Sequence, residues 1–104
     1  MYYTDTHIHL QDYKSHKVET VINSAEENGV LKFINASAHP SDWQKVADLA
    51  DKYPQIIPAF GIHPWYFNQA PDNWEINLES LLQKYPHALV GECGIDRLKN
   101  QDID

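Results

Sequence analysis

Cysteine and basic residues are both scarce in this sequence. Cys93 is the single cysteine, so the chain can form no internal disulfide, which is typical of proteins from a reducing cytoplasm. Lysine and arginine together number eight against fifteen acidic residues, which gives a formal charge of −7. A protein that holds nucleic acid by non-specific charge alone should be basic. Any phosphate ligand therefore needs local positive charge here, and bound divalent metal is the obvious source.

Long apolar runs are also missing. No stretch approaches the roughly 20 residues that a membrane-spanning helix needs, so no membrane association is expected. Residues 1–10 contain no basic segment followed by an apolar one, so they do not resemble a signal peptide. Apolar residues make up 42% and charged residues 22%, as in an ordinary globular protein. We therefore expect a folded protein in the cytoplasm.

What is present is an alternation of strand and helix patterns. Short apolar runs predict strands at residues 2–9, 31–36, 56–61 and 88–93. Apolar residues at helical spacing predict helices within residues 18–25, 43–53 and 76–85, which end at Gly29, Pro54 and Pro86. Ser41 with Gln44 and Asp72 with Glu75 have the spacing of capping boxes, and a fourth helix is expected from Arg97 onward.

Strands separated by helices predict a parallel sheet with right-handed crossovers. The fold class is therefore α/β, built of parallel (β/α) units. A whole (β/α)₈ TIM barrel takes roughly 200 residues or more, so 104 residues correspond to its N-terminal half, strands one to four. We expect residues 1–104 to form one partial barrel domain.

The first chemical signal is the segment Asp5-Thr6-His7-Ile8-His9 at the end of the first strand. Residues two apart on a strand share a face, so His7 and His9 should point the same way. Two such imidazoles at the C-terminal rim of a barrel can chelate one divalent ion. The alternative is a pair of ordinary histidines on an exposed edge.

The second signal is Glu92, at the tip of the fourth strand. A carboxylate at the end of a buried apolar strand is costly unless it is paired or bound to metal. Glu92 should lie across the barrel mouth from the first strand, where it could bridge two metals. The alternative is a glutamate in solvent.

The third signal is His63, in the loop after the third strand, followed by Trp65 and Tyr66. A histidine on this rim can hydrogen-bond a phosphate oxygen or help to place water, and the aromatic rings can stack on a base or sugar. Alternatively, the aromatics simply cover the barrel mouth. His39 lies on the same rim and is the weaker candidate.

Taken together, the sequence resembles the TatD family. The matching motifs are Asp-x-His-x-His-Leu at 5–10, Gly-Ile-His-Pro-Trp-Tyr at 61–66 and Val-Gly-Glu-x-Gly-Ile-Asp at 90–96. The resemblance implies a (β/α)₈ barrel that hydrolyses phosphodiester bonds in DNA with divalent metals, two ions of Mg²⁺, Mn²⁺ or Zn²⁺. It places His7 and His9 as ligands of the first metal, Glu92 as the bridging and catalytic glutamate, and His63 at the substrate.

Several alternatives remain open. The family's remaining ligands, two histidines and an aspartate, come from later strands, so we expect this polypeptide alone to be a weak or inactive nuclease. An amidohydrolase or another phosphoesterase with a His-x-His site is a rival enzyme class, and a non-catalytic truncation or interaction module is a rival of another kind. The two open sheet edges of a half barrel predict self-association.

Overall fold

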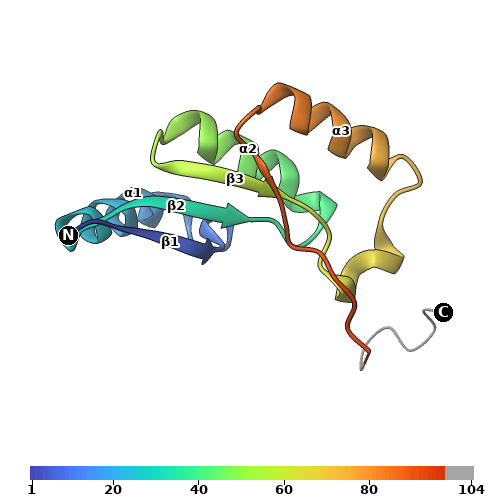
Figure 1. Cartoon of the computed structure of the whole chain (residues 1–104), viewed down its shortest axis with the longest axis horizontal. Helices are drawn as coiled ribbons and strands as arrows, with labels where there is room; N and C mark the ends of the chain where they lie inside the picture. Colours follow the sequence, from blue (N-terminus) through green and yellow to red (C-terminus); the bar gives the residue numbers. More distant parts are fainter. Residues whose placement is uncertain (98–104) are drawn as a thin grey trace.

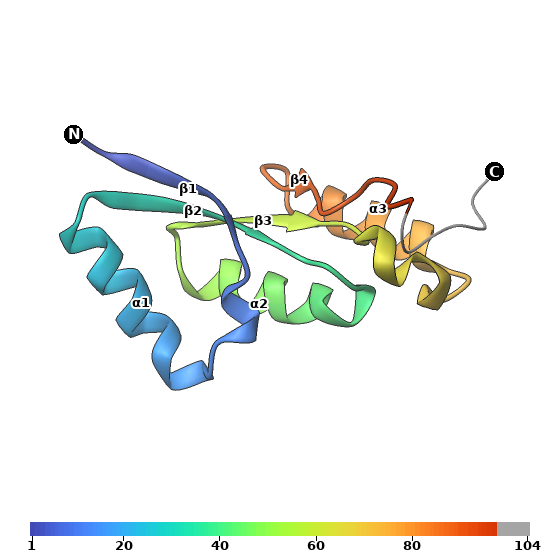
Figure 2. The same cartoon turned by 90° about the horizontal axis from the view of Figure 1, so that it is seen from below.

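The computed structural model describes residues 1–97. Four parallel strands form one sheet in the order β1 (Tyr3–Ile8), β2 (Val30–Ala36), β3 (Ile56–Phe60) and β4 (Leu89–Val90). Three α-helices connect them: α1 (Ser15–Glu27), α2 (Trp43–Lys52) and α3 (Trp74–Lys84). Figure 1 shows the strands running in the same direction along a curled sheet, and Figure 2 shows α1 and α2 together on one of its faces. The α/β class and the parallel arrangement expected from the sequence are confirmed.

Two apolar clusters hold the helices to the sheet. In the first, Val18 and Ile22 of α1 pack with Phe33 of β2 and Ile56 of β3. The second joins α2 to β3 and draws in α3, with Trp43, Val46, Ala47, Phe60 and Ile62 at its centre. All of these side chains are at most 8% exposed, and their burial drives the helices onto the sheet.

The other face of the sheet is open. Side chains alternate along a strand, so Ile34 and Ala36 lie on the face opposite Phe33. With Thr6, Ala59 and Leu89 they line a hollow of about 410 Å³. Leu89 is 45% exposed and Val90 57%, although both are apolar strand residues. The half-barrel therefore has one packed face and one uncovered face.

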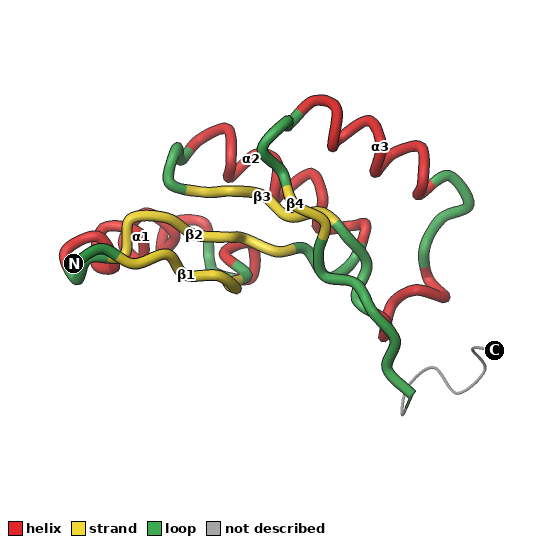
Figure 3. Tube along the Cα trace, in the orientation of Figure 1, coloured by secondary structure: helices red, strands yellow, loops and turns green. Residues whose placement is uncertain are grey.

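Short 3₁₀ turns follow the first three strands: η1 (Leu10–Asp12), η2 (Pro40–Asp42) and η3 (Pro64–Gln69). Figure 3 shows these turns at the same end of the sheet, in the loops that follow the strands. Gly29, which ends α1, has φ +89°, so its expected left-handed conformation is confirmed. A Cβ at this position would also lie 3.0 Å from the Met1 carbonyl oxygen.

Both expected capping boxes are wrong. Ser41 lies inside η2, since Pro40 already begins the helical turn, and the box is formed instead by His39 and Asp42. Gln44 instead bonds Asp48 along the face of α2. The helix α3 begins after Asn73, one residue later than an Asp72 cap requires, and no side chain caps it.

The fourth strand is shorter than expected, with two residues in place of 88–93. It pairs with β3 through Leu89 and Val90 only, and the chain then leaves the ladder so that the Glu92 N–H reaches the Ser37 carbonyl, 2.8 Å away. Arg97 lies in a turn, and the rest of the fourth helix expected there falls outside the described residues.

Candidate metal centre

His7 and His9 lie where β1 ends. Their imidazole rings meet edge to face, with centroids 4.8 Å apart and planes at 89°. The Asp5 side chain accepts the His7 backbone N–H at 3.0 Å, so this carboxylate stabilises the backbone at the end of the strand. The pairing register of β1 with β2 shifts between Asp5 and Ile8, so the strand is irregular just where the two histidines project.

Glu92 is positioned by Ser37, which lies outside the motifs singled out in the sequence, and by Gly61, which begins the motif at 61–66. The Ser37 carbonyl accepts the Glu92 backbone N–H, and the fully buried Ser37 hydroxyl accepts the Gly61 N–H at 2.9 Å. The same hydroxyl also lies 3.1 Å from the Gly61 carbonyl and 3.3 Å from the Gly91 carbonyl. A Cβ on Gly61 would be 2.2 Å from the Glu92 carbonyl oxygen. The Glu92 backbone therefore passes where only a glycine leaves room for it.

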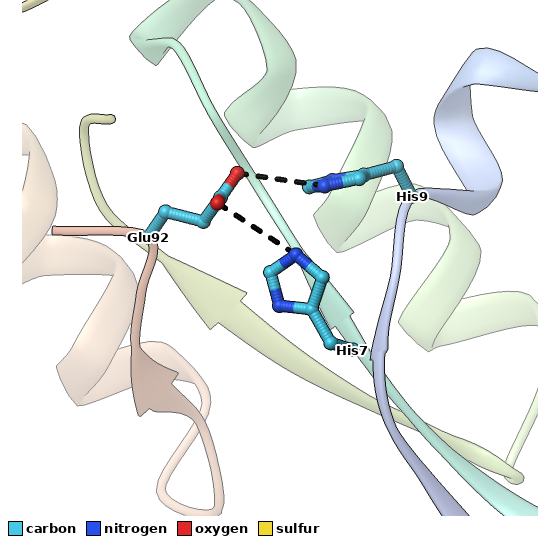
Figure 4. A group of neighbouring side chains, drawn as sticks. All are labelled: His7, His9 and Glu92. Carbon is cyan, nitrogen blue, oxygen red and sulfur yellow. Dashed lines mark ion pairs between the residues drawn. The ribbon is translucent and has the colours of Figure 1, made fainter. Parts of the chain in front are cut away.

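The three side chains converge, as Figure 4 shows. Nε2 of His7 lies 3.6 Å from one Glu92 carboxylate oxygen, and Nε2 of His9 lies 3.4 Å from the other. Their potential ligand atoms all lie within 4.8 Å of one another. The His7 side chain is 56% exposed, His9 30% and Glu92 22%, so the group is open on one side to solvent.

The hydrogen bond of His9 decides what its ring offers to Glu92. Its Nδ1 lies 2.7 Å from the Ala36 carbonyl oxygen, which can only accept, so Nδ1 carries the proton. In the neutral ring, Nε2 then presents a lone pair toward a carboxylate oxygen that is also an acceptor. Two facing acceptors need a cation between them, or a second proton on the ring.

The spacing suits a metal ion. Ligand atoms about 2.1 Å from a tetrahedral ion are about 3.4 Å from each other, which is close to the separations of Glu92 from the two imidazoles. Two imidazoles and a carboxylate are ligands that Zn²⁺ accepts, and a carbonyl that fixes the tautomer of a ligating histidine is a common support for such sites. His7, His9 and Glu92 therefore fit a divalent cation.

His63 lies outside this group, at the beginning of η3. Its ring packs against Trp65, with centroids 5.0 Å apart, and against Tyr66, with centroids 6.1 Å apart. The Trp65 indole N–H donates to Asp96 at 2.6 Å, which ties the loop after β3 to the segment after Glu92. His63 thus lies on the loop that follows β3, on the rim where the sequence places it.

Asn35 is another supporting residue that the sequence did not single out. Its fully buried side chain accepts the Leu10 N–H at 2.6 Å and so fixes the turn directly after His9. Together with the Ala36 and Ser37 carbonyls, it makes the end of β2 the common support of both His9 and Glu92. The available signal was a polar residue two positions after Phe33, on the packed face of β2.

Within residues 1–97, none of the helices has both the length and the apolar character that crossing a membrane requires.

Comparison with known proteins gives three findings. The sequence model of the family described as "TatD related DNase" matches residues 4–104. The chain is 27% identical to the Cut9-interacting protein scn1 of Schizosaccharomyces pombe over an alignment of 134 residues that includes 89% of the chain. It is 30% identical over 98 residues to YjjV of Escherichia coli K12, described as an uncharacterized metal-dependent hydrolase, and that match includes 90% of the chain.

The crystal structure of Escherichia coli YjjV, a TatD homolog, superimposes with a TM-score of 0.79 over 90% of the chain at 30% sequence identity. The chain spans 38% of the length of each of these relatives. Its curled sheet corresponds to the N-terminal half of a TatD (β/α)₈ barrel, as the sequence predicted.

Proposed function

The chain belongs to the family of TatD-related DNases, and on that premise we propose that its protein is a metal-dependent hydrolase that cleaves phosphodiester bonds in DNA. The observation that carries the proposal is the convergence of His7, His9 and Glu92 from opposite edges of the sheet. Residues 1–104 are proposed to form the first half of its barrel domain, which acts in the cytoplasm.

In this proposal His7, His9 and Glu92 hold divalent metal, with Glu92 shared between two ions. When bound, such ions polarise a phosphoryl oxygen and lower the pKa of a coordinated water. The Ala36 carbonyl keeps the His9 lone pair aimed at the site, and the backbone bond to Ser37 keeps Glu92 in reach. His63 and the half-exposed Trp65 contact the DNA strand from the neighbouring loop.

The surface charge supports a metal-dependent mode of binding. The chain carries a formal charge of −7, so a polyanionic substrate is repelled unless local cations offset the acidic groups. A divalent ion at Glu92 offers that compensation where the reaction takes place. DNA hydrolysis should accordingly require added metal at any ionic strength.

The test is cation binding followed by hydrolysis in the intact protein. Titration calorimetry with Mn²⁺ and Zn²⁺ should detect a site that Glu92→Gln weakens, while Glu75→Gln, on the exposed surface of α3, leaves it unchanged. Hydrolysis of a labelled DNA oligonucleotide should then depend on the same ions. Cation binding that survives the loss of Glu92 would remove the basis of the proposal.

Amide and small phosphate-ester substrates, assayed beside DNA, separate the rival enzyme classes.

A second candidate function is an interaction module without catalysis. The half-exposed Leu89 and Val90 of the edge strand β4 favour it, and the scn1 relative is named for an interaction with Cut9. Cation binding without turnover of any ester would support that candidate.

A further inference from the structure

Two His-Pro pairs begin 3₁₀ turns in the same way. His39-Pro40 precedes η2 and His63-Pro64 precedes η3, each directly beyond the C-terminal end of a strand. In each pair the imidazole Nδ1 accepts a backbone N–H two residues further on: Ser41 for His39, at 3.0 Å, and Trp65 for His63, at 3.1 Å. The imidazole Nδ1 therefore accepts the backbone hydrogen bond that a side-chain oxygen usually accepts at a turn.

This bond fixes where each ring holds its proton. A nitrogen that accepts a hydrogen bond carries no proton, so the neutral rings of His39 and His63 have theirs on Nε2. His9 is the opposite case, since its Nδ1 donates to Ala36 and its Nε2 offers a lone pair. His9 thus suits a cation, whereas His39 and His63 present N–H donors to an acceptor.

The two donor histidines share a neighbour. The Tyr66 ring centroid lies 5.5 Å from that of His39 and 6.1 Å from that of His63, and all three residues are partly buried. The His63 backbone N–H donates to the Ala38 carbonyl at 2.7 Å, which fastens the two loops together. In residues 1–97 neither Nε2 nor the Tyr66 hydroxyl hydrogen-bonds to a protein group.

The charges around these donors restrict the ligand. The Asp42 carboxylate lies 3.2 Å from the Ala38 N–H and 3.3 Å from that of His39, and Asp96 accepts from Trp65. With these carboxylates nearby, a singly charged phosphodiester is repelled less than a phosphate monoester, which carries about −1.5 to −2. Trp65, 49% exposed beside His63, offers a ring on which a base can stack.

We propose that His39, with His63 and Tyr66, forms a donor site for a phosphodiester oxygen of a nucleic-acid strand, at the same end of the sheet as the cation-binding group and independent of it. The inference deepens the proposed function and rests on it for the choice of a nucleic-acid strand. His39 is the residue newly assigned a role. Because the donors are neutral, binding at this site should fall only weakly with rising salt.

Two substitutions of His39 separate binding from folding. Asn at position 39 can place its side-chain oxygen where Nδ1 now accepts from Ser41, but it has no counterpart of the Nε2–H. Gln reaches further and can place an N–H near Nε2, but it loses the cap. A purely structural role predicts that H39N binds better than H39Q, and a donor role predicts the reverse order.

The measurement is fluorescence anisotropy of a labelled hexathymidylate on the intact protein in EDTA, so that neither metal nor turnover is needed. H39N should weaken binding about 10-fold or more, with H39Q affected less, while H87N, at an exposed histidine before β4, should bind as the wild type does. Wild-type affinity in H39N, or H39N binding more tightly than H39Q, would overturn the proposal. Competition by inorganic phosphate at the same concentration as the oligonucleotide would overturn the diester assignment.

Two further readouts keep this result separate from the proposed function. Imidazole ¹⁵N spectra should show His39 and His63 protonated at Nε2 and His9 at Nδ1, and an Nδ1 proton on His39 would contradict the inference. Calorimetric titration with Mn²⁺ should give H39N the cation affinity of the wild type. If the wild type binds no cation, the metal proposal fails while the comparison of oligonucleotide affinities still stands.

Discussion

His9 donates its Nδ1 proton to the carbonyl of Ala36 over 2.7 Å, and this bond leaves Nε2 facing Glu92. Ala36 contributes only backbone to the contact, so no substitution at position 36 removes the acceptor.

Gly61 should be irreplaceable because of the Glu92 backbone. A Cβ at this position would be 2.2 Å from the Glu92 carbonyl oxygen and 2.7 Å from the Gly91 carbonyl carbon, so Gly61→Ala must displace the segment that carries the ligand. We expect cation affinity, measured by calorimetry, to fall at least about 10-fold, as for other changes to the support of a metal site. Gly91→Ala is the matched control for space, since the nearest atom to its added Cβ is the Ala59 Cβ at 3.9 Å, an ordinary van der Waals contact. An unchanged affinity in Gly61→Ala would show that the Glu92 loop moves without cost.

Ser37→Ala should destabilise the fold and weaken the site together. The substitution leaves the buried Gly61 N–H without its acceptor, which costs about 1–3 kcal/mol. Urea unfolding should show that loss. Cation titration of the folded variant should show weaker binding because the hydroxyl contact to the Gly91 carbonyl is lost, although the backbone bond from Glu92 to the carbonyl of residue 37 remains. Ser80→Ala, exposed on α3, is the control. Loss of stability with full cation affinity would assign Ser37 a role in folding alone.

The free energy of unfolding should fall in alkaline solution because Tyr85 loses its phenol proton. Burial, together with a 3.0 Å hydrogen bond from its hydroxyl to Asp51, raises the pKa of Tyr85 above the ordinary 10.0. The folded state therefore holds the phenol proton more tightly than the unfolded state. The resulting stabilisation is complete below pH 10 and is lost as the pH rises through the raised pKa.

Urea unfolding of Tyr85→Phe at several pH values above 9 checks this prediction. The variant should lose less stability than the wild type over this range, while Tyr2→Phe, 78% exposed, should follow the wild type. Equal alkaline slopes for the wild type and Tyr85→Phe would assign the loss to other groups.

The 104-residue polypeptide, prepared by itself, should self-associate and show little or no nuclease turnover. The strands β1 and β4 are both edges of the sheet, and Leu89 and Val90 expose apolar surface on β4. Light scattering should give a mass above 12.0 kDa. A monodisperse monomer would contradict the first expectation, and DNA hydrolysis at the rate of a complete family member would contradict the second.

Sequence patterns were sufficient for the fold because it depends on burial. The spacing of Val18 and Ile22 and the apolar runs around Phe33 and Phe60 specify which faces pack, and the structure packs them so. The convergence of His7, His9 and Glu92 could be predicted from the strand order, since all parallel strands have their carboxyl ends at the same end of the sheet.

The residues that position His9 and Glu92 could not be predicted from the sequence, for a physical reason. The Ser37 hydroxyl contacts Gly61 and Gly91, and its carbonyl accepts the Glu92 N–H. These partners are more than twenty and fifty positions away, and no local sequence pattern encodes such contacts. The Ser41 cap was wrong because His39 already caps that turn, and an imidazole is not among the usual capping side chains. The early end of β4 reflects the same long-range bond between Glu92 and Ser37.

Two of the proposed ligands come from distant parts of the chain but bond to consecutive peptide units, His9 to the carbonyl of Ala36 and Glu92 to that of Ser37. A twist of this single strand end would move both side chains at once, so their distances to a bound cation should change together. The energetic effects of substitutions around His9 and around Glu92 should accordingly be non-additive, with a measurable coupling between residues more than eighty positions apart.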